Sequence, residues 1–296
     1  MLLPGEVIIH DGNAHEFAAP VVDGEQKAMG LVPREWNRNP CGFSAYAPMS
    51  AIQKIPRSEW SSRIKDLRES KSLMSDLRNI GNAGQPIPSR DQNGKGFCWG
   101  HSTVAAAILA RAKAGQSYAD LSAFAICCII KGYRDQGGWN GESMEFLATR
   151  GCPTSEFWPQ KSMSRSNDKP ETWANAALFK DTEWDDIPEG DFDLQMTYAI
   201  LGCPCPLDLN WWRHSICQAD PVDGQSCFPE MRASSGKLVT VQDFDTIWRV
   251  NDFGGAYGVR IWNSWSDSWS SNGMGILTEA KARNNGCIAL RVMTGS

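Results

Sequence analysis

The stretch that decides the fold is QNGKGFCWGHS, residues 92–102, a glycine-rich loop that leads into the helix-forming run TVAAAILARAKA. Gly115 follows that run and is suited to ending a helix. Cys98 is therefore predicted to stand in the first turn of a helix, where unpaired backbone N–H groups and the helix dipole favour a thiolate. Gln92 can fold back and donate a hydrogen bond beside the Cys98 N–H, which would complete a two-donor oxyanion hole for acyl transfer.

A second informative stretch is NSWSDSWSSNG, residues 263–273. The side-chain oxygen of Asn263 can hold a histidine ring in one tautomer, and Trp265 can pack over that hydrogen bond and exclude water. Tryptophans in a β-rich half are usually core residues, and that remains the simpler interpretation for most of the thirteen in this chain.

A cysteine nucleophile needs a base, and the chain has four histidines. Two of them lie close to the N-terminus. His101 lies three residues after Cys98 on the same predicted helix, so it faces the next turn rather than the thiol. His214, in the strand-like run 211–217, is the remaining candidate. From these residues alone, a purely structural role for His214 stays open.

Together the motifs resemble those of the papain-type (clan CA, C1-like) cysteine peptidases, which place Gln before Cys-Trp at the same interval and use the chain order Cys, His, Asn. The resemblance implies an α+β papain-like fold of two lobes. A helical lobe would carry Cys98, a β-barrel-like lobe would carry His214 and Asn263, and the cleft would lie between them. The implied reaction is peptide-bond hydrolysis through a Cys98 thioester, with Gln92 at the oxyanion and with no metal or cofactor.

The segment QGGW, residues 136–139, resembles the family loop whose glycine backbone pairs with an extended polypeptide substrate as an added strand. The resemblance thus assigns Gly137 and Gly138, together with Trp265, to substrate binding. A plain turn is an equally good interpretation of the four loop residues alone.

Two positions at which the family has a disulfide carry opposite charges here. In the family, the residue three before the catalytic Cys and the residue before Asn-Gly-Gly are both Cys, whereas this chain has Lys95 and Asp135. We expect a Lys95–Asp135 ion pair in place of that bridge. The ten cysteines of the chain include a neighbouring pair and are too sparse for a disulfide scaffold, so most are predicted to be buried thiols.

Several departures from the family pattern bear on activity. Arg213 precedes His214 where the family often has Asp or Asn, and a cation there disfavours a thiolate–imidazolium pair. Ser266 and Ser270 replace two glycines of the family's Asn-Ser-Trp motif. These differences leave a second interpretation open, namely a structural component of a virion or other assembly, built on a papain-like fold with weak or no peptidase activity.

The N-terminal part, residues 1–54, has no helical period and is too short to be the usual inhibitory propeptide of the family. Its apolar runs at 7–9 and 18–22 favour strand addition to a sheet edge, and we expect it to serve homo- or hetero-oligomeric assembly rather than autoinhibition. Residues 55–296 would form the peptidase-like domain, with an inserted helix at about 58–80 and an inserted loop at about 227–245.

Composition excludes several other functions. The 296 residues include 29 basic and 34 acidic ones, for a formal net charge of −5, and the basic residues are scattered, so nucleic acid is not an expected partner. The first residues have no apolar core of a signal peptide, and no stretch approaches the roughly 18 apolar residues of a membrane span. We therefore expect cytoplasmic synthesis, no membrane contact, and incorporation in a virion or other assembly if the second interpretation holds.

Further helices are predicted at about 121–132 and 141–150, the second of which ends at Gly151. After Pro153 the chain turns to loops and extended runs. The first half is thus predicted to be helical and the second half to be β-rich.

Overall fold

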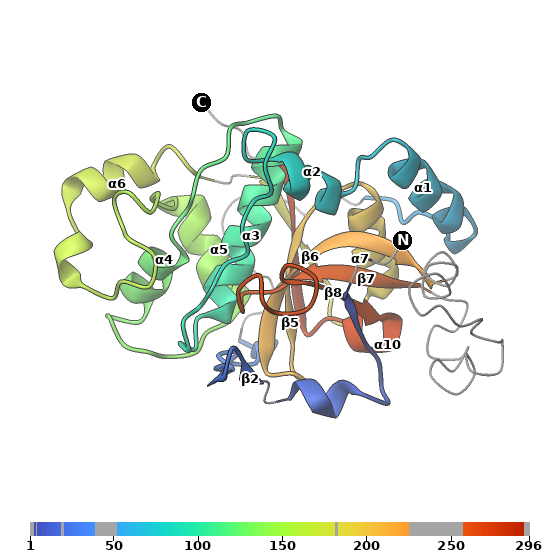
Figure 1. Cartoon of the computed structure of the whole chain (residues 1–296), viewed down its shortest axis with the longest axis horizontal. Helices are drawn as coiled ribbons and strands as arrows, with labels where there is room; N and C mark the ends of the chain where they lie inside the picture. Colours follow the sequence, from blue (N-terminus) through green and yellow to red (C-terminus); the bar gives the residue numbers. More distant parts are fainter. Residues whose placement is uncertain are drawn as a thin grey trace.

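The computed structural model describes residues 3, 5–18, 21–38, 52–180, 183–224 and 257–292. Several helices gather on one side of α3 (Cys98–Lys113), and the sheet lies on the other side of α3 together with further helices at its edges (Figure 1). This is the predicted α+β arrangement of a helical and a β-rich lobe. The inserted loop expected at 227–245 lies outside the described residues.

The helical lobe is built around α3, which is buried from Cys98 to Ala110. Its alanines let other elements approach closely on several sides, and it contacts α4 (Ala123–Ile130) and α5 (Asn140–Thr149) as well as the sheet. A Cβ at Gly100 would overlap the Cys127 sulfur, so only glycine permits the contact between α3 and α4. The helices predicted at 98–114, 121–132 and 141–150 are confirmed, with ends shifted by one or two residues.

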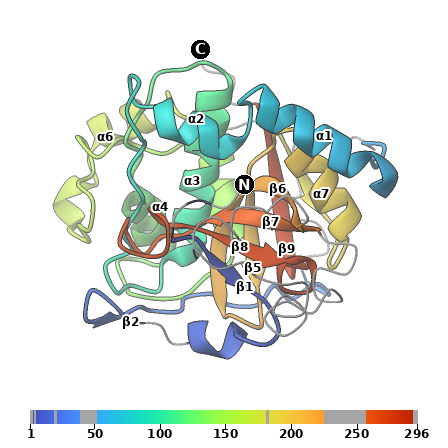
Figure 2. The same ribbon diagram turned by 45° about the vertical axis from the view of Figure 1, so that its right-hand side comes forward.

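The β-rich lobe is a seven-stranded sheet of order β1-β8-β7-β6-β5-β9-β4. Only the β1–β8 pairing is parallel among the described strands. Figure 2, turned by 45°, shows β5 to β9 stacked beside α3. The strands are β1 (Val7–Ile9), β4 (Glu183–Ile187), β5 (Cys205–Leu209), β6 (His214–Asp223), β7 (Tyr257–Trp262), β8 (Met274–Thr278) and β9 (Gly286–Val292).

The inserted helix expected at 58–80 is in fact two helices, α1 (Arg57–Glu69) and α2 (Met74–Ile80). The chain leaves α1 at Ser70, and Lys71 takes a left-handed conformation with φ of 53°. A helix cannot continue through that conformation, so the single helical period predicted from sequence is interrupted there.

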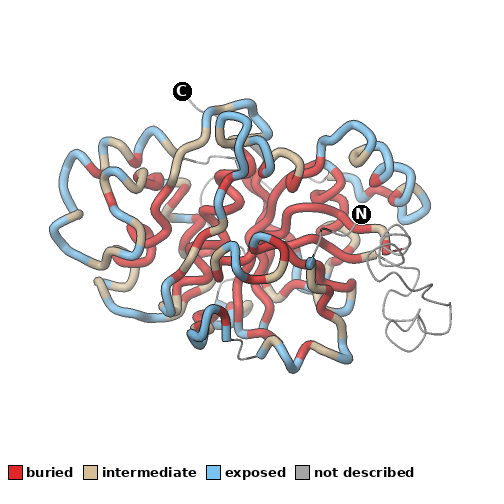
Figure 3. Tube along the Cα trace, in the orientation of Figure 1, coloured by how far each residue is buried: buried red, intermediate tan, exposed pale blue. Residues whose placement is uncertain are grey.

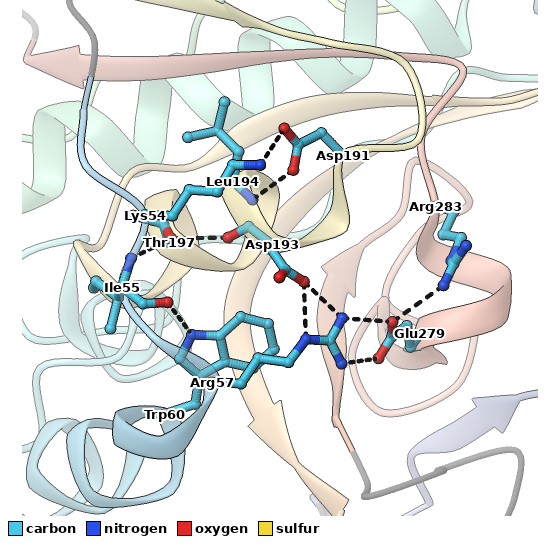
Figure 4. A network of polar contacts seen from close by, with 10 residues as sticks. All are labelled: Lys54, Ile55, Arg57, Trp60, Asp191, Asp193, Leu194, Thr197, Glu279 and Arg283. Carbon is cyan, nitrogen blue, oxygen red and sulfur yellow. Dashed lines mark hydrogen bonds and ion pairs between the residues drawn. The ribbon is translucent and has the colours of Figure 1, made fainter.

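The start of the main domain is fastened by a polar network (Figure 4). The Trp60 indole donates to the Ile55 carbonyl at 2.9 Å, and the Ile55 N–H donates to the Thr197 hydroxyl at 3.1 Å. Arg57 donates to Asp193 and to Glu279, and these two acceptors raise its pKa despite partial burial. The network ties α1 to α7 (Phe192–Ile200) and α10 (Glu279–Ala282).

The core follows the sheet and α3, while the outer faces of α1 and of α6 (Pro170–Ala176) are exposed (Figure 3). Six of the described tryptophans are fully buried and supply much of the apolar surface removed from water. They are Trp60, Trp99, Trp158, Trp212, Trp262 and Trp265.

The N-terminal arm wraps its own domain in two places. Strand β1 adds to the edge strand β8, as predicted for the first apolar run. Glu6 beside it forms a buried ion pair of 2.6 Å with Arg260, which Asp220 also contacts at 3.1 Å. The second apolar run behaves differently from the prediction, because Val21–Val22 pairs with Glu25–Gln26 in a separate two-stranded sheet. No helix among the described residues is long and apolar enough to cross a bilayer.

Candidate active site

Cys98 is the first residue of α3 and is fully buried. Burial raises the pKa of its thiol to about 11, although backbone N–H groups of Ser215 and Gly30 donate to the sulfur and act in the opposite direction. The neutral thiol is therefore the stable form in the described state. The two N–H groups come from different parts of the chain, since Ser215 belongs to β6 whereas Gly30 belongs to the N-terminal arm.

His214 begins β6, and its Nε2 lies 2.8 Å from the Asn263 Oδ1. Because that oxygen also accepts the Ser264 N–H at 2.7 Å, it must be an acceptor, so Nε2 carries the ring proton. The other nitrogen, Nδ1, has no hydrogen bond to any described residue and keeps its lone pair. Burial lowers the pKa of His214 to about 4, partly offset by Asn263, so the ring is neutral.

Trp265 packs on the His214 ring with centroids 4.5 Å apart and is fully buried. The structure thus places this predicted substrate-binding residue behind the imidazole, where it shields the bond to Asn263. His101, also fully buried, packs edge-on against Phe124 and does not take the place of His214.

Gln92 joins the two sequence motifs directly. Its Oε1 accepts the Ser264 hydroxyl at 2.7 Å, and its backbone N–H donates to the Ser264 carbonyl at 3.0 Å. Its amide nitrogen donates to the Ala28 carbonyl at 2.9 Å. The Gln92 side-chain amide, which was predicted to donate to an oxyanion, therefore donates to a carbonyl oxygen of the arm.

The glycine loop also pairs with the arm. The Gly138 N–H donates to the Gly30 carbonyl at 3.0 Å, and the Val32 N–H donates to the Gly138 carbonyl at 2.8 Å. This is a parallel bridge between Leu31 and Gly138, and a Cβ at Gly137 would crowd the Gly30 carbonyl. A segment of the same chain thus pairs with the glycine loop at the position predicted for an extended substrate.

The arm is seated tightly at its closest approach to Cys98. A Cβ at Gly30 would overlap the Gly96 carbonyl, so no larger residue fits in this position. Leu31 follows, is buried, and donates its N–H to the Arg213 carbonyl at 3.2 Å. Residues 28–32 of the N-terminal part therefore cross the site, although the sequence favoured an assembly role over autoinhibition. Sequence patterns missed this because the contacts are made by backbone groups, which leave no side-chain signature.

The ion pair predicted at the family's disulfide position is confirmed, with Lys95 Nζ 3.5 Å from Asp135 Oδ2. Asp135 also accepts the Gly96 N–H at 2.8 Å. The eight described cysteines are buried and form no disulfide with one another, whereas Cys41 and Cys227 lie outside the described residues.

A buried carboxylate behind the site escaped the sequence analysis. Asp208 on β5 accepts the Ser215 hydroxyl and, at 3.1 Å, the Asn140 N–H. Burial raises its pKa to about 7. Its signal in the sequence is a lone acidic residue within the apolar strand run 205–209.

A cysteine at the start of a buried helix, packed against the strand that begins with a histidine bonded to an asparagine, is typical of a papain-like architecture. Comparison of the sequence with protein-family models and with curated proteins finds no match. Solved structures are similar, however.

Xylellain, a cysteine protease from Xylella fastidiosa, has a TM-score of 0.54 at 14% identity over 90% of this chain and 97% of its own. Digestive procathepsin L 3 of Tenebrio molitor has a TM-score of 0.54 at 14% identity over 94% and 79%. Bromelain from Ananas comosus has a TM-score of 0.50 at 15% identity over 70% and 94%. The chain therefore has a papain-like α+β fold, and identities this low establish the fold alone.

Proposed function

We propose that this protein is a papain-like cysteine peptidase that hydrolyses peptide bonds through a Cys98 thioester. The observation that carries the proposal is the 2.8 Å bond between His214 and Asn263, on the strand end next to a cysteine at the N-terminus of a buried helix. Asn263 fixes Nε2 of His214, while Nδ1 has no hydrogen bond to a described residue and can accept a proton. A histidine with a purely structural role would not need a nitrogen held ready in this way.

The reaction follows from these positions. His214 Nδ1 accepts the thiol proton, and the Cys98 thiolate attacks the substrate carbonyl carbon. Gln92 Nε2 and the Cys98 N–H stabilise the oxyanion that forms. His214 then returns the proton to the leaving amine, and a water molecule, activated by the same nitrogen, hydrolyses the thioester.

The arm holds this machinery in a resting state. The Ala28 carbonyl occupies the Gln92 donor, and the sulfur faces the Gly30 N–H, which is not an electrophile. Burial under the arm favours the neutral thiol and the neutral imidazole. Displacement of the arm would return water to both groups and permit a thiolate–imidazolium pair. The exposed Arg213 side chain is solvated, which weakens its effect on that pair.

The alternative, a structural or virion component, gains no support from the structural neighbours, which are named as proteases. Assembly through residues 1–54 remains a proposal. The contacts of β1 and Glu6 are made to the arm's own domain, and a partner would have to bind outside them.

The test is covalent labelling by a peptidyl epoxide, followed by mass spectrometry and a fluorogenic peptide assay. We expect one adduct, on Cys98. It should form faster in Arg34→Gln and Gly30→Val, the variants expected to displace the arm, and Cys98→Ala should show no adduct and no turnover. Cys203→Ala, which removes another buried thiol, should behave as wild type. Absence of adduct and turnover even after displacement of the arm would overturn the proposal.

A further inference from the structure

Beyond the point where it crosses Cys98, the arm carries a buried arginine, Arg34. The Arg34 side chain is 0% exposed, and its two terminal nitrogens lie 3.0 and 2.9 Å from the two carboxylate oxygens of Asp186. The guanidinium carbon lies 5.3 Å from the ring centroid of Trp139 and 3.7 Å from that of Trp36. A planar cation is thus held by a forked carboxylate and aromatic faces.

Two of these partners belong to the main domain rather than to the arm. Asp186 lies on β4, and Trp139 directly follows Gly138, the residue that pairs with the arm. The Trp139 ring is fixed because it packs over Gly141, where a Cβ would overlap it. We call Asp186 and Trp139 the guanidinium site.

Electrostatics around the guanidinium site favour a cation. The pKa of Asp208 is raised to about 7, chiefly by burial, and Arg34 is among the groups that counteract the rise. When the arm leaves the cleft, Asp186 loses its bidentate partner while it stays at the edge of a low-dielectric region. A carboxylate that loses two charge-assisted hydrogen bonds at such a place favours a second guanidinium in the same position.

The guanidinium site is within reach of a bound substrate. Arg34 is three residues beyond Leu31, which pairs with Gly138, and an extended chain advances by about 3.3 Å per residue. A substrate strand seated on Gly138 therefore needs only a few residues to bring a side chain to Asp186. The forked carboxylate and the indole face favour arginine over lysine.

We infer that Asp186 and Trp139 form a specificity site that selects substrates with an arginine near the residue that pairs with Gly138. The inference rests on the proposed peptidase function, and Arg34 is the intramolecular occupant of the same site. A mere clasp for the arm would also bind the free arm peptide, but it would give no arginine preference in turnover, so the second experiment separates the two interpretations.

The first experiment measures binding without catalysis. Full-length protein carrying Cys98→Ala and Arg34→Gln is titrated with the acetylated peptide amide of residues 28–35 and with its citrulline analogue at the Arg34 position. We expect at least roughly tenfold tighter binding of the arginine peptide. Adding Asp186→Asn, which pairs with the Gln to leave no unbalanced charge, should abolish the difference. Glu189→Gln, at an exposed carboxylate on the loop after β4, should preserve it.

The second experiment measures selection of substrates. Full-length Arg34→Gln protein is assayed with a positional-scanning library of fluorogenic peptides that carry arginine, citrulline or leucine at each position. We expect arginine to exceed citrulline by at least roughly tenfold in kcat/KM at one position, with the preference lost on adding Asp186→Asn and turnover of neutral peptides retained.

The outcomes separate the two claims. Cys98 labelling and turnover without discrimination between arginine and citrulline in either experiment would overturn the guanidinium site and leave the peptidase proposal intact. Discrimination in binding with no labelling or turnover would overturn the peptidase proposal, while the guanidinium site would stand as a binding site.

Discussion

Two ion pairs border the path of the arm, and they differ in nearly every physical respect. Lys95–Asp135 supports the loop on which Gly30 rests, with one contact of 3.5 Å and side chains 37% and 40% exposed. Arg34–Asp186 lies at the other end of the path, is bidentate, and has side chains 0% and 8% exposed. The first joins two segments of the domain, whereas the second joins the arm to the domain.

The difference in exposure between the two pairs indicates which contact keeps the arm in the cleft. An exposed pair gains little because water and salt screen it, whereas removal of one member of a buried pair leaves a charge with no partner. We therefore expect the Arg34 end to dominate the closed state, with the glycine contact at Cys98 second and the exposed pair last.

The largest effect is expected for Arg34→Gln. Loss of one partner of a buried ion pair costs about 3–5 kcal/mol, so the arm should leave the cleft and Cys98 should react with iodoacetamide at pH 7 roughly 100-fold faster or more. The matched control is Arg38→Gln, which removes the exposed pair with Glu35 in the same arm. An unchanged labelling rate in Arg34→Gln would show that the buried pair does not hold the arm.

Gly30→Val tests the other contact of the arm. The new side chain would overlap the Gly96 carbonyl, and overpacking of this kind costs about 1–3 kcal/mol. Labelling of Cys98 should therefore accelerate about 5- to 150-fold. Val32→Thr, at a side chain that is 50% exposed, should leave the rate near that of wild type. Equal rates in the two variants would contradict the tight seat at Gly30.

The comparison of the two ion pairs also marks the limit of sequence reasoning. The Lys95–Asp135 pair was predictable because a family motif supplied both positions, and the same motifs predicted the bond between His214 and Asn263. Arg34 and Asp186 are separated by 152 positions and belong to no motif, so only the folded chain shows that they meet. Local helix signals predicted α3, α4 and α5, but the break at Lys71 depends on a backbone conformation that composition does not encode.

The buried His101 makes the stability of the folded core depend on pH. Burial, with the nearby positive charge of Arg90, lowers the pKa of His101 to about 3 from 6.5, and its ring nitrogens have no hydrogen bond to described residues. The unfolded chain binds the extra proton between these values, so stability is complete above pH 6.5 and falls as the pH decreases towards 3.

His101→Phe removes that proton without loss of a described hydrogen bond. It should recover about 2 kcal/mol of unfolding free energy at pH 5 relative to wild type, with little change at pH 7.5. Urea unfolding at the two pH values measures the effect, and His15→Gln, at an exposed histidine, is the control. A variant whose pH dependence parallels that of wild type would show that His101 is not buried in the neutral form.

The smallest effect is expected for the exposed pair, measured by a double-mutant cycle with Lys95→Ala and Asp135→Ala. With both side chains more than a third exposed and one contact of 3.5 Å, the coupling energy should stay below about 1 kcal/mol and shrink further in 1 M salt. Asp135→Ala should cost more than Lys95→Ala because the Gly96 N–H also loses its acceptor. Cys98 labelling should change by less than roughly threefold in either variant, since neither residue bonds to the arm directly. A coupling energy well above that limit, or fast labelling in Lys95→Ala, would show that the exposed pair keeps the arm in the cleft. The order of the two ion pairs would then be the opposite of the one proposed here.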